Sequence, residues 1–143
     1  MSESSYSPSQ NHLFTFPKTE RLSSRKEIQK VFTSKKSQFS HPFKVLFVLL
    51  SETDEYVAFP QVLISVPKRI FKKAVDRNLI KRRIREAYRL NKNTVWDSEK
   101  KNTIKSLAII YVDKTILPFD KIEKQLIKAL EKVALASNPK NQS

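Results

Sequence analysis

One segment, Pro67–Lys92, constrains the fold of this chain more than any other: PKRIFKKAVDRNLIKRRIREAYRLNK. It contains eleven basic and two acidic residues, and so carries nine of the chain's fourteen net positive charges. Basic residues recur every four positions, in one stripe along a helix: Lys73, Arg77, Lys81, Arg85 and Arg89. The apolar residues fall on a different face: Ile80, Ile84, Ala87 and Tyr88. The segment therefore predicts a helix packed on one side and presenting a rigid polyanion-binding surface on the other.

The composition indicates a single folded domain with an anionic partner. A length of 143 residues suits one domain, and 39% hydrophobic residues suffice for a core. The pI near 10.1 points to nucleic acid first and to an anionic membrane surface second. The absence of Cys excludes disulfides and thiolate metal sites and suits a reducing cytosol. The absence of Gly excludes Gly-rich phosphate loops, and turns that need positive φ must use Asn or Asp or be avoided.

No targeting or membrane segment is predicted. The first residues lack the basic start and apolar run of a secretory signal. The longest apolar stretch, Val45–Leu50, is too short to cross a bilayer, so we expect a soluble, cytoplasmic protein. Residues 1–20 are expected to form a flexible tail, 21–136 one domain and 137–143 a second flexible tail. The apolar residues before Pro17 are expected to dock on the domain rather than stack on bases: Leu13, Phe14 and Phe16.

Periodicity predicts an alternation of helices and strands. Helices are expected at 25–34, at 75–91 and from Pro118 onward, the first begun by a Ser24–Glu27 capping box. Strands are expected at 43–50, 61–66 and 107–112. The first should be covered on both faces, and the last, LAIIYV, should be central and buried. Polar connections are expected at 35–40, at 51–56 as a hairpin loop, and at 93–105 around Trp96.

This order, α-β-β-(β)-α-β-α with one optional strand, predicts an α+β fold: a small two-layer sandwich with a mixed sheet. Physical preference alone makes the crossover around the basic helix right-handed.

The residues that commonly carry catalysis form no constellation. His12 and His41 lack metal-spaced partners, and the adjacent Asp54 and Glu55 are typical of a solvated turn. The sequence therefore argues against a self-sufficient enzyme. Within the basic helix, Asn78 is either a local capping residue or a contact to phosphate or base. Tyr88 is expected in the core. Arg82 is expected to pair with Glu86 at i,i+4 or to contact RNA, and the two roles could share that face.

The segment Ala74–Ala87, AVDRNLIKRRIREA, closely resembles the signature helix of the bacterial ribonuclease P protein component. The preceding Val62–Arg69 resembles that family's strand and basic exit, and Glu20–Leu22 with Ile28–Phe32 resembles its first helix. The similarity covers about 21–134. It implies a small subunit of ribonuclease P, whose partners are the catalytic RNA and precursor tRNA and which promotes removal of the tRNA 5′ leader. Cleavage would be carried out by the RNA subunit with Mg2+, which that RNA mainly binds, so that the protein alone holds no metal and has no catalytic residue.

The resemblance also assigns residues to roles. Those expected to face the catalytic RNA are Lys68, Arg69, Lys73, Arg77, Asn78, Lys81, Arg82, Arg85 and Arg89. Those expected toward a leader-binding cleft between sheet and first helix are Ile28, Phe32, Lys44 and Leu46. The family fold implies a left-handed crossover, which replaces the right-handed default.

The chain departs from the family pattern at a few positions. Leu79 stands where an Arg is usual, and Gln61 and Leu63 replace an Arg and a Gly. Ile28 and Leu46 occupy positions that are often aromatic, which predicts weaker base stacking in the cleft but not weaker phosphate binding.

Two other functions suit the composition. A ribosomal or general RNA-binding protein would show no preference for precursor tRNA over mature tRNA. A peripheral membrane protein would use the basic helix at an anionic surface, but the absence of a broad exposed apolar face opposite its charges argues against this. We expect neither a membrane nor a small-molecule partner.

Overall fold

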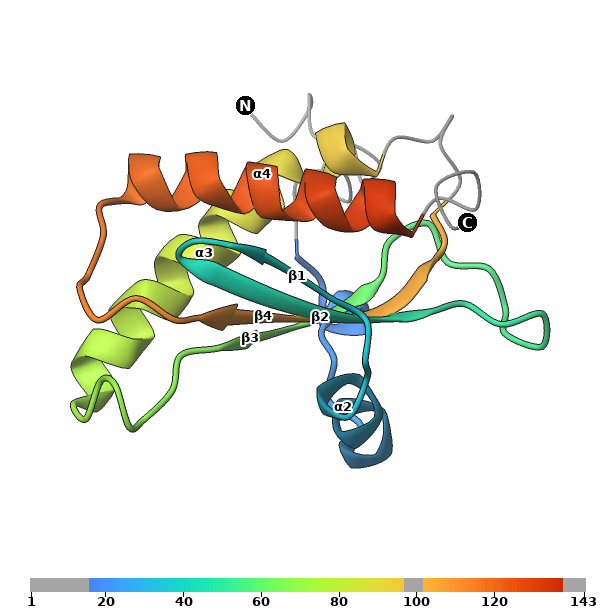
Figure 1. Cartoon of the computed structure of the whole chain (residues 1–143), viewed down its shortest axis with the longest axis horizontal. Helices are drawn as coiled ribbons and strands as arrows, with labels where there is room; N and C mark the ends of the chain where they lie inside the picture. The colour runs from blue at the N-terminus through green and yellow to red at the C-terminus, as the bar shows by residue number, and fades with distance from the viewer. Residues whose placement is uncertain (1–15, 97–101, 138–143) are drawn as a thin grey trace, which may run out of the picture.

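The computed structural model describes residues 16–96 and 102–137, which form one mixed sheet covered by helices (Figure 1). Its elements are the short 3-10 helix η2 (Lys18–Glu20), α2 (Arg25–Phe32), β1 (Ser37–Ser40), β2 (Phe43–Leu49), β3 (Gln61–Ser65), α3 (Ala74–Val95), β4 (Ile104–Tyr111) and α4 (Phe119–Ala136). This is the mixed α+β fold that the sequence predicts. The optional strand is β1, which lies in a segment whose polarity does not mark it as a strand.

The four strands lie in the order β1-β2-β4-β3. β1 pairs with β2 and β2 with β4 in antiparallel fashion, whereas β3 and β4 are parallel. The hairpin predicted at 51–56 is therefore wrong, because β4 lies between β2 and β3. The uninterrupted apolar run of β4 explains its place: Leu107, Ala108 and Ile109 are fully buried, as a central strand requires. The hand of the β3–α3–β4 crossover stays a prediction.

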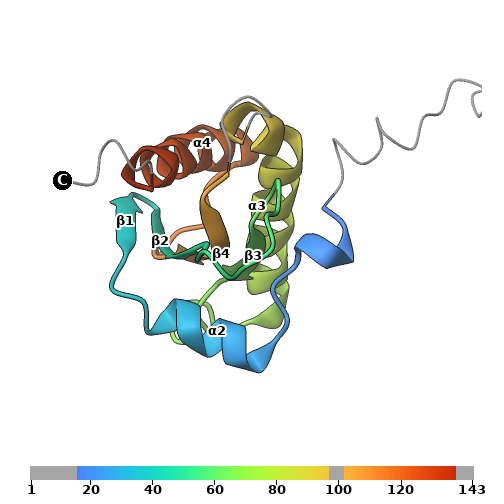
Figure 2. The ribbon, with the colours of Figure 1, turned by 90° about the vertical axis from the view of Figure 1, so that its right-hand side faces the viewer.

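Helices cover both faces of the sheet (Figure 2). α3 and α4 lie on one face, where Phe43, Val45 and Phe47 of β2 join the main core. α2 lies on the other face, where Leu46 of β2 packs with Val31 in a smaller cluster. Both faces of β2 are thus covered, as its sequence predicts. Burial of each large apolar side chain contributes roughly 1.5–3 kcal/mol, so the main core holds α3 in a fixed position. No helix in the described ranges has the length and apolar character to span a membrane.

The basic helix, α3, ends later than its sequence predicts. α3 continues to Val95, and both Val95 and Trp96 are buried. The Trp96 ring lies 5.8 Å from that of Tyr88. The polar residues 91–94 mask this apolar end, which is why the pattern alone places the boundary near Asn91. Likewise β4 begins at Ile104, inside the expected polar connection, with Ile104 fully buried.

Residues just before the predicted start of the domain also pack on it. Phe16 is buried, and its ring contacts Tyr88 edge-on at 5.2 Å. The Arg21 guanidinium lies over the Phe16 ring, 5.3 Å from its centre, and Arg21 pairs with Val62 as an isolated bridge. Docking of Phe16, rather than display for base stacking, is confirmed. Leu13, Phe14 and the rest of the two expected tails, apart from 16–20 and Ser137, lie outside the described residues.

The turns avoid the left-handed region throughout the described ranges, where no residue has positive φ. The tight β1–β2 turn contains a cis His41–Pro42 peptide bond. His41 is exposed, as expected for a loop histidine, and its Nε2 lies 2.9 Å from Asp113 Oδ2.

Candidate nucleic-acid interface

The cationic surface is built on α3, the longest helix. Its buried residues recur on one side and anchor it to the core: Ile80, Ile84, Ala87, Tyr88 and Val95. Tyr88 is fully buried, so its expected place in the core is confirmed, and burial followed by the charge of Glu20 raises its pKa. Asn78, Arg82 and Arg85 are exposed on the opposite side, with Lys81 half-buried beside them. The helix therefore presents cations from a rigid support.

Arg77 ties the basic turn before α3 to the helix. Its guanidinium donates to the carbonyl oxygens of Phe71 at 2.7 Å and of Lys72 at 3.0 Å. Phe71 is buried, and its N–H donates to the carbonyl of Pro67. These bonds hold the turn 67–73 in place, so that Lys68, Arg69 and Lys73, all exposed, lie beside the first turn of α3. Arg77 thus positions neighbouring cations besides contributing its own charge.

The basic residues of 67–92 fall into two groups. Nine of them form no ion pair with any described residue. Two of the nine, Arg77 and Arg83, donate to backbone carbonyls. The other seven are Lys68, Arg69, Lys72, Lys73, Lys81, Arg82 and Arg85. Arg89 is paired, because its Nε and Nη2 donate to Glu86 at 3.0 and 2.6 Å. That hydrogen bond lowers the pKa of Glu86. Glu86 therefore pairs with Arg89 and not with Arg82, which leaves Arg82 exposed.

Lys92 is a cation of the segment that does not belong to the surface. Its side chain is 0% exposed, and its Nζ lies 2.7 Å from Glu20 Oε1 and 4.5 Å from the centre of the Phe59 ring. Lys92 therefore contributes to the charge count of the segment but not to its cationic surface. The sequence holds a signal for its burial, because Lys92 follows Ile84 and Tyr88 at intervals of four and shares their side of the helix.

The predicted leader-binding residues lie on the sheet face that α2 covers. Lys44 is exposed, and Phe32 at the end of α2 is 41% exposed. Leu46 is only 8% exposed and packs in the cluster beneath α2, against which Ile28 is also packed. The structure thus brings these four residues to one region, with Phe32 and Lys44 open to a ligand and Leu46 closed.

Phe39 is a residue of this region that sequence reasoning missed. It lies directly opposite Lys44 in the β1–β2 register, and its side chain is 58% exposed. Proteins that bind single-stranded nucleic acid combine exposed aromatics for base stacking with cations for phosphate, and Phe39 and Lys44 are such a pair of groups. No residue pattern marks β1 as a strand, so this placement is visible only in the structure.

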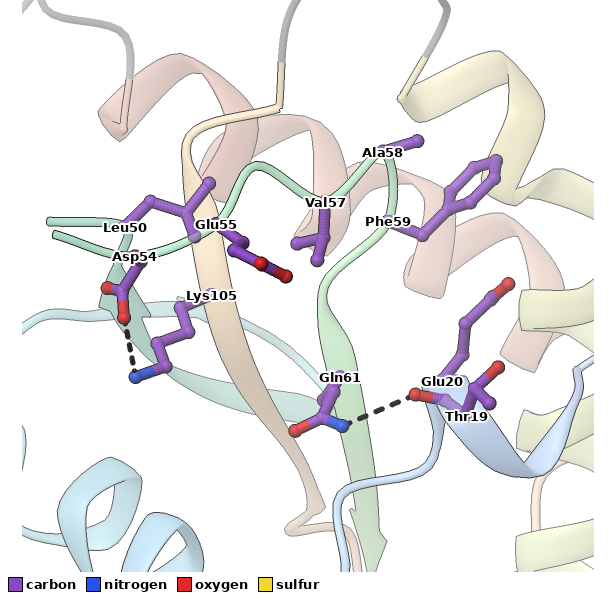
Figure 3. A pocket seen from close by; sticks show the side chains of 10 residues that line it. All are labelled: Thr19, Glu20, Leu50, Asp54, Glu55, Val57, Ala58, Phe59, Gln61 and Lys105. Atoms are coloured by element: carbon purple, nitrogen blue, oxygen red, sulfur yellow. Dashed lines mark hydrogen bonds and ion pairs between the residues drawn. The ribbon is translucent and has the colours of Figure 1, made fainter. Parts of the chain in front are cut away.

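Away from these two surfaces, ion pairs among the described residues join Lys105 to Glu27 and Asp54, and His41 to Asp113. A pocket of about 440 Å³ lies among η2, the loop 50–59 and β4 (Figure 3). In it Asp54 Oδ1 lies 3.0 Å from Lys105 Nζ, and Gln61 donates to the carbonyl of Thr19 at 3.3 Å. The N–H of Ser51 and then Lys105 lower the pKa of Asp54 to about 2. No group of three His, Cys, Asp or Glu side chains in the described ranges could hold a metal ion.

The fold and this surface define a small α+β domain that presents a cationic helix and, on the sheet face that α2 covers, the exposed side chains of Phe32, Phe39 and Lys44. Comparison with known proteins identifies its kind. The family model for ribonuclease P matches residues 16–134, and this chain belongs to the ribonuclease P protein family.

Individual relatives agree with this assignment. A ribonuclease P protein component of Porphyromonas gingivalis is 37% identical over 122 residues, covering 85% of this chain and 88% of the relative. One of Dictyoglomus turgidum is 32% identical over 125 residues, covering 86% and 96%. The solved RNase P proteins of Thermotoga maritima and Staphylococcus aureus have TM-scores of 0.61 and 0.58, each at 25% identity. They match 79% and 83% of this chain and 96% and 98% of their own.

Proposed function

We propose that this protein is the subunit of ribonuclease P that binds the catalytic RNA and the 5′ leader of precursor tRNA, and so promotes endonucleolytic removal of the leader. The observation that carries the proposal is the set of unpaired cations on and before α3, within the part of the chain that matches the family. The RNA-facing set includes Lys68, Arg69, Lys73, Asn78, Lys81, Arg82 and Arg85. Arg77 and Arg89 stand at its edges, the first holding the basic turn and the second shared with Glu86.

The physical role of these cations is to bring two polyanions together. Catalytic RNA and precursor tRNA repel each other through their phosphates, and fixed positive groups between them offset that repulsion. Arg grips phosphate through two parallel hydrogen bonds, whereas Lys acts as a point charge. Because the core already fixes α3, little conformational freedom is lost when RNA binds. Phosphate contacts of this kind predict an affinity that falls steeply with salt.

The leader would lie on the face that carries Phe32, Phe39 and Lys44. Phe32 and Phe39 offer exposed rings for stacking, and Lys44 offers charge for phosphate. Phe39 compensates for the aromatic residues that Ile28 and Leu46 replace. Leu46 and Ile28 support this surface by packing α2 onto the sheet.

Cleavage is assigned to the RNA subunit, with Mg2+ that this RNA mainly binds. The protein's residues then bind and orient the RNA rather than move protons. The site of action would be the cytoplasm, where tRNA precursors are made, without a membrane or small-molecule partner.

Binding to matched tRNAs tests this proposal. The holoenzyme assembled from this protein and its catalytic RNA should prefer tRNA bearing a 5′ leader over the same mature tRNA, and the RNA alone should prefer it less. Equal affinity for both, with and without the protein, would instead indicate a general RNA-binding protein.

A further inference from the structure

A second row of cations lies on α4, away from the surface described above. Four lysines recur on its exposed side at intervals of three and four residues: Lys121, Lys124, Lys128 and Lys132. At 1.5 Å per residue the row extends over about 16 Å. None of the four forms an ion pair with a described residue. Lys132 donates to the carbonyl of Phe39 at 3.2 Å, on the edge strand β1.

Stability of the helix does not explain this row. Like charges four residues apart destabilise a helix, and the row contains two such pairs, Lys124 with Lys128 and Lys128 with Lys132. The favourable place for lysine is the last turn, where α4 has no basic residue. Only Lys132 has a structural role, since a lysine over a free strand edge blocks unwanted pairing. Lys121, Lys124 and Lys128 are therefore left without a role within the fold.

The two cationic surfaces point in different directions. α3 faces α4 through Asn91, which donates to Glu123 at 2.9 Å, and through Arg83, which donates to the carbonyl of Leu117 at 2.6 Å. At about 100° per residue, Arg83 lies about 160° around α3 from both Lys81 and Arg85, and Asn91 lies about 80° from Lys81 and about 120° from Arg85. On α4, Glu123 lies on the α3 side, whereas Lys132 reaches β1 on the other. The two rows of cations thus lie on different outer sides of the helix pair.

The chemistry of the row favours nucleic acid over other partners. Lysine is depleted in protein–protein interfaces. A helix that lies on a membrane has an apolar face with several Trp, Phe or Leu side chains beside its cations, whereas Leu135 is the one large apolar side chain of α4 that is exposed. Regularly spaced, unpaired lysines on a rigid helix suit a row of phosphates.

We propose that the lysine row of α4 is a second RNA-binding surface, which contacts the phosphate backbone of RNA at a place separate from the RNA facing α3. This rests on the proposed function, because it assumes that the protein acts within an RNA complex. The backbone bound here belongs either to the catalytic RNA or to the precursor tRNA, which share the same chemistry.

The test measures the salt dependence of binding for the variant Lys124→Gln/Lys128→Gln. A matched control exists in Lys26→Gln/Lys30→Gln, a pair of exposed lysines with the same spacing on α2. Each lost phosphate contact reduces the slope of log K against log salt by about 0.7–0.9. The α4 variant should therefore lose about 1.4–1.8 of the slope, which makes its affinity deficit about tenfold larger at 50 mM than at 200 mM salt.

Two RNA probes identify the source of the backbone. If the α4 variant has a shallower slope when it binds the catalytic RNA without tRNA, the row contacts that RNA. If the slope is shallower only when the holoenzyme binds precursor tRNA, the row contacts the substrate. Unchanged slopes with both RNAs, or an equal change in the control variant, would overturn the proposal for α4. The proposed function would stand in that case, provided that the wild-type protein binds the RNAs. If the wild type binds neither RNA, both fail. In the wild-type complex, RNA should also protect Lys124 and Lys128, but not Lys26 and Lys30, from acetylation measured by mass spectrometry.

Discussion

Replacement of Lys92 by Met should weaken the fold but leave RNA binding intact. Lys92 is fully buried against Glu20 and Phe59. Removing one partner of a buried ion pair typically costs about 3–5 kcal/mol, because the other charge stays buried and unpaired. Met keeps most of the packing of the lysine stem, and the Glu20 side chain is 9% exposed, so the lower end, about 3 kcal/mol, is expected. For a domain of this size, that corresponds to a Tm lower by roughly 10 °C.

The matched control is the same substitution at Lys81, on the outer side of the same helix. Thermal unfolding and RNA binding across a salt series should give opposite results for the two variants. Lys92→Met should lower Tm and keep the wild-type salt slope, whereas Lys81→Met should keep Tm and reduce the slope by about 0.7–0.9. Adding Glu20→Gln to Lys92→Met should recover part of the lost stability, since no buried charge then remains. A Lys92→Met protein with unchanged Tm and a reduced slope would show that Lys92 faces RNA and would refute this reasoning.

Three further predictions follow from individual contacts. Arg77→Ala should reduce the salt slope of RNA binding as Lys81→Ala does. It should also lower Tm, because the backbone carbonyls that the Arg77 guanidinium binds lose their donor. Equal Tm values for Arg77→Ala and the wild type would argue against the positioning role of Arg77. Phe39→Ala should reduce the preference of the holoenzyme for leader-bearing tRNA in competition binding while leaving affinity for mature tRNA unchanged, and loss of both would place Phe39 outside the leader site. Asp54, with its pKa held near 2 against a usual 3.8, should stabilise the fold above pH 3.8 and lose this effect as pH falls toward 2. The free energies of unfolding of the wild type and of Asp54→Asn, measured by chemical denaturation, should therefore converge as pH falls over that range. A difference that stays constant with pH would contradict this prediction.

Much of the fold is readable from local patterns. The heptad-like spacing of α3 and α4, the apolar run of β4 and the two-sided burial of β2 follow from residues a few positions apart. Strand order does not, because the place of β4 between β2 and β3 depends on contacts between distant segments. β1, with the sequence Ser37-Gln38-Phe39-Ser40, owes its existence to pairing with β2 rather than to its own composition.

The candidate site shows the same division. Spacing identifies which residues share a side of α3, and this places Lys81 and Arg85 outward and Tyr88 inward. Charge counting fails where a partner comes from elsewhere in the chain: Glu20 takes Lys92 into the interior, and the Leu117 carbonyl takes Arg83. The role of Leu46 beneath α2, and of Phe39 beside Lys44, likewise depends on the tertiary arrangement.

The central claim is that folded, fixed cations assist an RNA that performs the cleavage. Its most direct test is leader removal from precursor tRNA by the organism's catalytic RNA, measured across a magnesium series with and without this protein. We expect the protein alone to cleave nothing, and its addition to lower the magnesium concentration at which the RNA cleaves. Identical magnesium curves with and without the folded protein would contradict the claim.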